Sequence, residues 1–132
     1  MILLDTHTLL WWSGQIGSRL SERAFSLIEE EKAKTSLLVS TISMWEITML
    51  CERGRLGLKQ NLDDWLRELE GNPFVKFIPI DNRIAVEANR LPDPFHRDPA
   101  DRLIVATARL LDIPLLTADT KILDYPFVRN VW

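Results

Sequence analysis

The amino-acid sequence predicts an α/β fold in which a central, mostly parallel sheet carries helices on both faces. Short apolar segments alternate with longer segments of helical periodicity along the chain, which is typical of this class. The first short segment, Ile2–Asp5, is apolar up to its last residue, as expected for a strand covered on both faces. The chain has 132 residues and 46% hydrophobic content, which suffices for one core. We therefore expect a single domain over residues 1–132, with right-handed crossovers between its strands.

The first forty residues are predicted to form a strand, a helix and a second strand. Ile2–Asp5 is the first strand, and a helix is expected to follow it. Ser21 is a suitable N-cap for a helix. The apolar side of that helix is formed by Leu20, Ala24, Phe25, Leu27 and Ile28. Ser36–Ser40 is short and apolar between its two serines, and it is predicted to be the second strand.

Two helices are predicted in the middle of the chain. One is expected from Ser43 to Gly54, because Ser43 and Glu46 fit a capping box and Gly54 suits the C′ position. Asn61 is expected to begin the other helix, which Gly71–Pro73 stops.

The remaining elements continue the alternation of strands and helices. Val75–Ile80 is predicted to be a third strand, and Asp81 caps a helix that ends before Pro92. A long helix is predicted after that loop, with Asp98 at its N-cap and Pro99 at its N1 position. The last predicted elements are a strand ending near Thr117, a short helix starting around Asp119 and a closing strand, Phe127–Trp132.

Composition narrows the possible functions. The single cysteine, Cys51, excludes an internal disulfide, and no segment resembles a signal peptide, so we expect a reducing, cytoplasmic location. No apolar run approaches the roughly 18 residues that span a bilayer, so no membrane partner is expected. The net charge of −3 provides no overall attraction to nucleic acid. A polyanionic partner must therefore be held by a local basic patch or by metal ions.

Four acidic residues are expected at the carboxyl edge of the predicted sheet, where open α/β folds bind their ligands. They are Asp5, Glu46, Asp101 and Asp119. Carboxylates that converge there cannot all ionise unless cations neutralise them. Because the set offers only oxygen ligands, and cysteine and histidine are nearly absent, it favours Mg²⁺ or Mn²⁺ over zinc.

Each acid also has a purely structural interpretation, which its spacing leaves open. Glu46 can complete the capping box with Ser43, and Asp101 suits the first turn of a helix. Asp119 can act as an N-cap. The same explanation applies to Asp5 only if a helix begins directly after it, since a buried aspartate is uncommon without a partner.

Four segments of the chain carry a family resemblance, namely LLDTHTLLWW, STISMWEI, HRDPADRLIVATA and LLTAD. In their order and spacing they resemble the PIN-domain ribonucleases, and within that family the VapC toxins of bacterial toxin–antitoxin pairs. The resemblance covers essentially the whole chain. The DPAD sequence departs from the DPFD often seen in such proteins, which concerns packing rather than chemistry.

This resemblance implies hydrolysis of RNA phosphodiester bonds that depends on Mg²⁺ or Mn²⁺ and leaves 5′-phosphate and 3′-hydroxyl ends. It assigns metal binding to Asp5, Glu46, Asp101 and Asp119, with Thr6, Asp98 and Thr117 in supporting positions. One or two ions would activate water and stabilise the leaving oxygen, so no protein nucleophile is required. It also implies restraint by a small VapB-like antitoxin and a homodimeric state.

Several basic and aromatic residues are weaker candidates for RNA or protein contacts. Those considered for RNA contact are His7, Arg53, Arg55, Lys59, His96, Arg97 and Arg102. For each of them a structural histidine or a solvated surface charge is an equally simple interpretation. Trp11 and Trp12 cannot both point inward on one regular element, so one of them is a candidate for an interface.

Three alternative functions share parts of this pattern. A haloacid dehalogenase-like phosphatase also ends its first strand on an aspartate, but it requires a second aspartate where His7 stands here. A receiver domain needs a phosphoacceptor aspartate that the middle strands do not supply. A catalytically silent RNA-binding module on the same fold would not need all four acids.

Overall fold

Five strands form one sheet in the computed structural model, which describes residues 1–132. The strands are β1 (Ile2–Leu4), β2 (Leu37–Ser40), β3 (Val75–Ile78), β4 (Leu115–Leu116) and β5 (Asn130–Val131). Their order across the sheet is β3-β2-β1-β4-β5, and every neighbouring pair is parallel. The predicted parallel sheet is thus confirmed.

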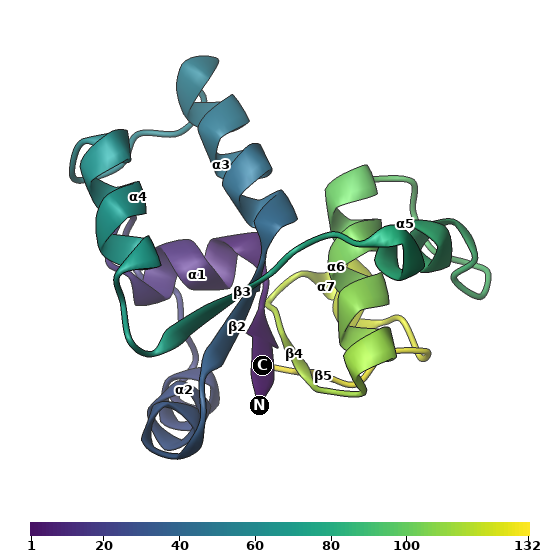
Figure 1. The fold of residues 1–132 in the computed structure, drawn as a ribbon. Coiled ribbons are helices and arrows are strands. Elements are labelled where there is room, and N and C mark those ends of the chain that lie inside the picture. Colours follow the sequence, from purple (N-terminus) through teal and green to yellow (C-terminus); the bar gives the residue numbers. More distant parts are fainter.

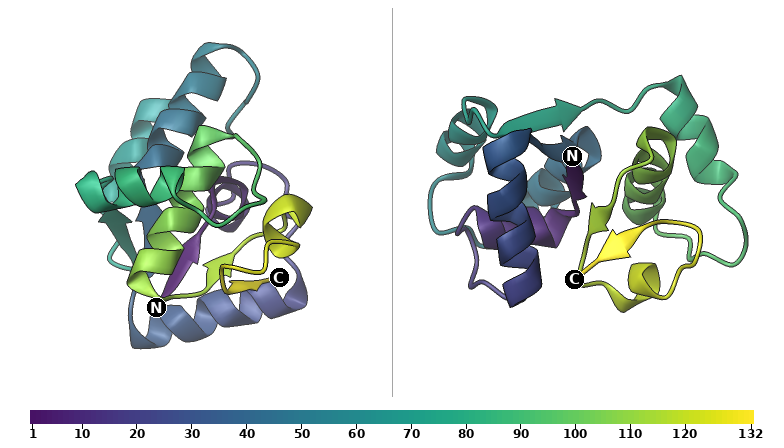
Figure 2. Two further views of the ribbon diagram at one scale, coloured as in Figure 1. Left: turned by 90° about the vertical axis from the view of Figure 1, so that its right-hand side faces the viewer. Right: turned by 90° about the horizontal axis from the view of Figure 1, so that it is seen from below.

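Seven helices cover the two faces of this sheet (Figures 1 and 2). They are α1 (Thr6–Trp12), α2 (Glu22–Lys34), α3 (Thr41–Glu52), α4 (Leu62–Glu70), α5 (Asn82–Asn89), α6 (Pro99–Leu111) and α7 (Thr120–Leu123). Helices α1 to α4 lie on one side of the sheet and α5 to α7 on the other (Figure 1). No helix combines the length and the apolar character needed to cross a membrane.

Two hydrophobic clusters, one on each face of the sheet, form the core. Successive side chains of a strand point to opposite faces, so Leu3 packs with α5 and α6 whereas Ile2 and Leu4 pack with α1 and α2. This explains why β1 is apolar at every position. All three of its residues are at most 1% exposed.

Most predicted caps are present in the structure. The side chains of five residues accept a hydrogen bond from a backbone N–H of the helix that each precedes. They are Ser21, Asn61, Asp81, Asp98 and Asp119. Gly54 follows α3 with a φ of 68°, the left-handed conformation that favours glycine.

Some predicted boundaries were wrong. Helix α3 begins at Thr41 rather than Ser43, because Ser40 is its N-cap and accepts from the N–H of Ile42 at 3.2 Å. The capping box that would have included Glu46 therefore does not form. Strand β3 ends before Pro79, whose nitrogen cannot donate to a ladder. Helix α1 begins at Thr6, directly after β1, which is the condition under which an N-cap role explains Asp5.

The order of the strands creates a crevice beside the central strand. The chain runs from β1 outward to β2 and β3, and then crosses to β4 on the other side of β1. At such a switch point the connections leave β1 and β4 in opposite directions, which opens a space at their carboxyl ends. Asp5 follows β1 directly, and Asp119 lies three residues after the end of β4.

Candidate functional site

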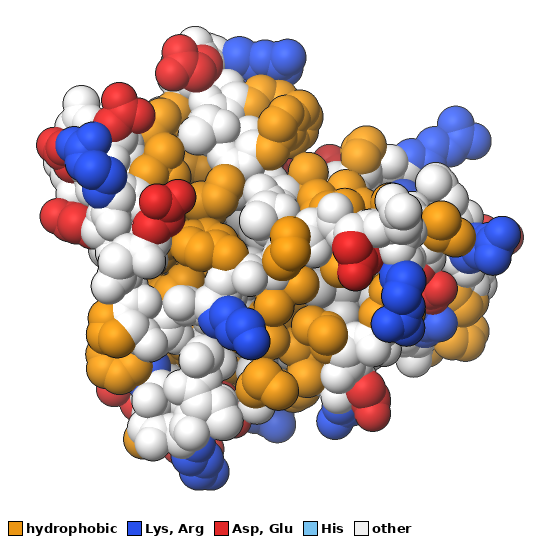
Figure 3. All heavy atoms as spheres, in the orientation of Figure 1, with side chains coloured by type: hydrophobic (Ala, Val, Ile, Leu, Met, Phe, Trp, Pro, Cys, Tyr) orange, Lys and Arg blue, Asp and Glu red, His pale blue; other side chains and the backbone are white.

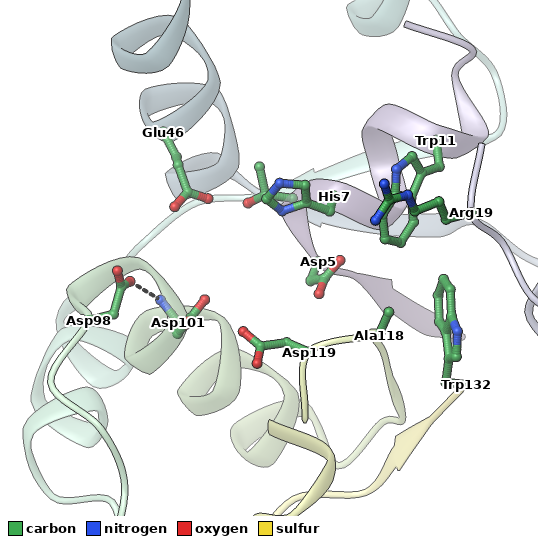
Figure 4. A pocket seen from close by; sticks show the side chains of 11 residues that line it. Asp5, His7, Trp11, Arg19, Glu46, Asp98, Asp101, Ala118, Asp119 and Trp132 are labelled. Atoms are coloured by element: carbon green, nitrogen blue, oxygen red, sulfur yellow. Dashed lines mark hydrogen bonds between the residues drawn. The ribbon is translucent and has the colours of Figure 1, made fainter. Parts of the chain in front are cut away.

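An open cleft of about 590 Å³ lies at this switch point. It is lined by Asp5, Thr6, His7, Trp11, Arg19, Glu46, Asp98, Asp101, Ala118, Asp119 and Trp132. Figure 4 shows Glu46, Asp98 and Asp101 at one side and the two tryptophans with Arg19 at the other. Asp5 and Asp119 lie between them. The structure therefore brings all four predicted acids to one cleft.

Asp5 is the most deeply placed of these acids. It is the N-cap of α1, and its Oδ1 accepts from the N–H of Thr8 at 2.8 Å. Its Oδ2 accepts a short hydrogen bond from the hydroxyl of Thr117. Burial raises the pKa of Asp5, and the hydrogen bonds from Thr117 and Thr8 oppose that rise. Because α1 begins directly after β1, its first turn holds the Asp5 carboxylate in place. The carboxylate still faces the cleft.

Thr117 joins two of the acids. Its hydroxyl donates to Asp5 and accepts from the backbone N–H of Asp119 at 3.0 Å. Asp119 in turn accepts from the N–H of Lys121 at 2.9 Å as the N-cap of α7. The hydroxyl of Thr117 therefore links the acid that follows β1 to the acid that follows β4, the neighbouring strand. Thr6, also predicted as a supporting residue, bonds through its hydroxyl to Ser43 at 2.9 Å.

Asp101 projects from the first turn of α6. Asp98, the N-cap of α6, accepts from the backbone N–H of Asp101 at 3.0 Å (Figure 4). Partial burial, together with the like charges of Asp98 and Asp119, raises the pKa of Asp101 to about 6, although a hydrogen bond from His96 opposes this rise. The charge of this carboxylate is thus only partly compensated in the folded protein.

His96 contacts Asp101 rather than lying in a solvated loop. Its Nε2 is 2.7 Å from Oδ2 of Asp101, and its side chain is 22% exposed. Arg102 holds the backbone around it, because the guanidinium donates to the carbonyls of Ala88, Phe95 and His96. These bonds use Nε and Nη1 of Arg102, so a contact of this residue with RNA stays a prediction. No sequence pattern indicated the His96–Asp101 pair.

Glu46 is the acid contributed by α3. It lies in the second turn of the helix, is half-buried, and makes no side-chain hydrogen bond or ion pair. Figure 4 shows its carboxylate on the same side of the cleft as Asp98 and Asp101 and directed toward them. The group is therefore free to bind a cation or a water molecule.

Of the other residues predicted to contact RNA, some line the cleft and others lie outside it. His7 is exposed on α1 and lines the cleft, and Trp11 lines it as well. Arg53, Arg55 and Arg97 are exposed but are not part of the cleft lining, so their contact with RNA stays a prediction. On the face drawn in Figure 3, basic side chains are scattered among acidic ones rather than gathered in a patch.

Sequence reasoning missed two further residues of the cleft, Arg19 and Trp132. Arg19 lies in the loop between α1 and α2, and Trp132 follows β5. Trp132 is brought to the cleft by the fold, since β5 pairs with β4 and so places the end of the chain near Ala118 and Asp119. No local pattern around either residue indicated such a position.

The donor set of the cleft fits a hard divalent cation. All candidate ligands are carboxylate oxygens that face one cleft. Burial raises the pKa of Asp5, and burial together with the like charges of Asp98 and Asp119 raises the pKa of Asp101. No group of three acidic or histidine side chains is already gathered at coordinating distance.

Comparisons with known proteins agree with these observations. The model of the PIN domain matches residues 2–128. Ribonuclease VapC22 of Mycobacterium tuberculosis (strain ATCC 25618 / H37Rv) is 36% identical over 130 residues, which are 98% of this chain and 95% of that protein.

Solved structures share the fold over nearly their whole length. A toxin–antitoxin complex from Klebsiella pneumoniae matches with a TM-score of 0.67 at 20% identity and covers 100% of this chain and 97% of its own. VapBC2 from Rickettsia felis, bound to a DNA fragment from its promoter, matches with a TM-score of 0.71 at 14% identity, covering 99% and 98%. Since the family model spans all but a few residues and the similar ribonuclease is aligned almost end to end, this chain belongs to the PIN-domain family.

Proposed function

We propose that this protein is a ribonuclease that requires Mg²⁺ or Mn²⁺ and acts as the toxin of a type II toxin–antitoxin pair. One observation carries the proposal: Asp5, Glu46, Asp101 and Asp119 line a single cleft in a chain that is 36% identical to ribonuclease VapC22. The four acids come from four separate places in the sequence. Local capping explains some of their hydrogen bonds, but it does not explain why all of them face one open space.

Each acid has a proposed role in this cleft. Asp5 and Asp101 are the primary metal ligands, because Asp5 is the most deeply placed acid of the cleft and Asp101 is crowded by the like charges of Asp98 and Asp119. Glu46 and Asp119 complete a second site or orient the attacking water. Thr117 fixes the carboxylate of Asp5 through its hydroxyl. A bound divalent ion supplies Lewis-acid activation of the scissile phosphate and of the attacking water.

The charge of the cleft explains why such a cation is needed for RNA to bind. Five acids line it, whereas Arg19 is its only arginine or lysine. A phosphodiester entering this space meets net repulsion, since the chain as a whole is also acidic. Cations held by the acids convert that repulsion into attraction at the position where the bond is cut.

Partners are proposed from the same comparisons. Similar folds occur in VapBC2 from Rickettsia felis and in a toxin–antitoxin complex from Klebsiella pneumoniae, which supports a VapB-like antitoxin for this chain. A homodimer is proposed as well, with RNA as the substrate. The single free cysteine, Cys51, suits the reducing cytoplasm as the place of action.

The alternative functions are less well supported. A phosphatase-like mechanism is not favoured, because the chain belongs to the PIN-domain family and has His7 where that mechanism requires a second aspartate. A catalytically silent RNA-binding module is separated from a ribonuclease by a direct assay of cleavage.

The test is cleavage of RNA by the purified protein, freed of antitoxin, with Mg²⁺ or Mn²⁺ and then with EDTA. We expect cleavage with 5′-phosphate and 3′-hydroxyl ends, its loss in EDTA, and its loss in Asp5→Asn and Asp101→Asn while both variants stay folded. Asp112→Asn, which changes an aspartate outside the cleft, is the matched control and should cleave normally. Cleavage that persists in EDTA and in both cleft variants would show that the acids are structural.

A further inference from the structure

We propose that Trp11, supported by Trp132, is a stacking platform for one unpaired nucleobase beside the acids. The proposal rests on the proposed ribonuclease function and specifies how the RNA is held. It assigns a specificity role to a wall of the cleft that the metal-binding acids do not occupy.

The platform is a row of aromatic rings along one side of the cleft. The ring centroids of Trp11 and Trp132 are 5.5 Å apart with an interplanar angle of 54°, and the ring of His7 lies 5.9 Å from that of Trp11. Figure 4 shows both tryptophans across Asp5 and Asp119 from the remaining acids. A base stacked there would lie in the same cleft as the acids.

Core packing does not account for the position of Trp11. Trp12 and Trp132 pack against the hydrophobic cluster beneath α1 and α2, but Trp11 is not part of either core cluster or its margin. Instead Trp11 borders two adjoining hollows, the acidic cleft and a second one of about 570 Å³ formed with Arg19 and the loop before it. A half-buried indole between two open spaces presents a surface that a flat ligand can cover.

Charge favours an aromatic mode of binding at this end of the cleft. Arg19 is its only cationic side chain besides a histidine, and Arg19 has no ion-pair or hydrogen-bond partner. It can therefore pair with a flanking phosphate. Stacking on an aromatic ring needs no net attraction and accepts every base, since each has a π-face. In a protein with a net charge of −3, such contacts are a suitable source of affinity for RNA.

An unpaired base is the ligand that this geometry selects. Bases in a duplex are stacked on each other and offer no free face, whereas bases in single strands and loops can be splayed onto an aromatic side chain. The platform therefore predicts a preference for single-stranded RNA over a duplex of the same sequence, and it predicts that this preference depends on Trp11.

The experiment compares Trp11→Ala, Trp11→Leu and Trp11→Phe. Leucine keeps apolar bulk without a flat ring, and phenylalanine keeps the ring. Trp45→Phe changes a tryptophan that is 58% exposed outside the cleft and is the matched control. Binding of a labelled 8-nucleotide RNA and of its duplex is measured by fluorescence anisotropy in the Asp101→Asn background. Cleavage is measured in the otherwise wild-type protein with Mg²⁺.

We expect Trp11→Ala and Trp11→Leu to weaken binding of the single strand by roughly 5- to 150-fold, the range for removal of one stacking ring. The cleavage KM should rise by a similar factor with kcat nearly unchanged, because binding to the ground state is lost. Duplex binding should change little in any variant. Trp11→Phe should retain most of the affinity, and Trp45→Phe all of it.

The outcomes separate the platform from the proposed function. If the wild type cleaves RNA and Trp11→Ala cleaves with the same KM, the platform is overturned and the function stands. If no RNA is cleaved but the Asp101→Asn protein binds the single strand in a manner that Trp11→Ala abolishes, the function fails and the platform stands. If the Asp101→Asn protein binds no RNA because it no longer holds a cation, the cleavage KM of Trp11→Ala in the otherwise wild-type protein decides. Equal losses for single strand and duplex also overturn the platform.

Discussion

The carboxylate of Asp101 should destabilise the metal-free protein at neutral pH, so replacing it with asparagine should raise the free energy of unfolding. Burial and nearby acids raise its pKa from 3.8 to about 6 in the folded protein, whereas it titrates near the ordinary value when unfolded. Between these two values the folded protein binds more protons than the unfolded chain. The stabilisation that Asp101 contributes is therefore fully present below its ordinary, unfolded pKa, and it is lost as the pH rises through its folded-state pKa.

The size of the effect follows from the same shift. One pKa unit corresponds to about 1.4 kcal/mol, so ionised Asp101 costs the fold roughly 3 kcal/mol above the upper value. Asparagine removes this cost but weakens the hydrogen bond with His96, which is worth about 1 to 1.5 kcal/mol. We expect Asp101→Asn to be more stable than wild type by roughly 1.5–2 kcal/mol at neutral pH, or about 5–8 °C in Tm.

The assay is urea and thermal denaturation in EDTA, from acidic to neutral pH, for wild type and Asp101→Asn. The gain should vanish at a pH below the ordinary pKa of aspartate, where both proteins are neutral at this position. Asp112→Asn is the control, because Asp112 has an exposed side chain and a left-handed φ of 53° that asparagine tolerates. A difference of the same size at every pH, or a less stable variant at neutral pH, would refute the reasoning.

Three further predictions concern the cleft and its support. Millimolar Mg²⁺ should stabilise the wild type, by about 1.4 kcal/mol in the free energy of unfolding when Mg²⁺ is at tenfold excess over its Kd, and so should raise its Tm in a thermal-shift assay. The Tm of Asp101→Asn should not rise; equal shifts in the two proteins would contradict the site. Thr117→Val should lower the free energy of unfolding in urea by roughly 1.5–3 kcal/mol, because buried Asp5 loses a donor without a change in packing volume; an unchanged midpoint would show that this bond contributes nothing. Arg102→Ala should destabilise the fold, also by roughly 1.5–3 kcal/mol, since three carbonyls lose their donors. In the Asp101→Asn background it should leave RNA affinity unchanged; a stable variant with weaker RNA binding would show that Arg102 contacts RNA instead.

Local sequence determined most of the elements, because their signals act over a few residues. Asp98 and Pro99 are sufficient to begin α6, since a side-chain acceptor and a fixed φ are what its first turn requires. The same local logic failed at α3. Ser40 and Ser43 are both suitable N-caps, and only the end of β2 at Ser40 decides between them. Ser43 is instead buried and bonded to Thr6.

The chemistry of the site was also encoded locally, whereas its assembly was not. Four acids at predicted strand ends and helix starts, together with the family resemblance, pointed to a cation site before any contact was known. The sequence could not show that Thr117 bridges Asp5 and Asp119, or that His96 donates to Asp101. These contacts depend on the distance between β1 and β4 and on the loop before α6.

What the sequence by itself determined is therefore the type of fold, the caps and the identity of the acids, since each of these depends on neighbouring residues or on a single apolar period. What only the tertiary structure decided is which side chains share the cleft. Trp132 reaches Trp11 across more than a hundred residues because β5 pairs with β4 beside β1. Such juxtapositions arise from strand order, which no local interaction specifies.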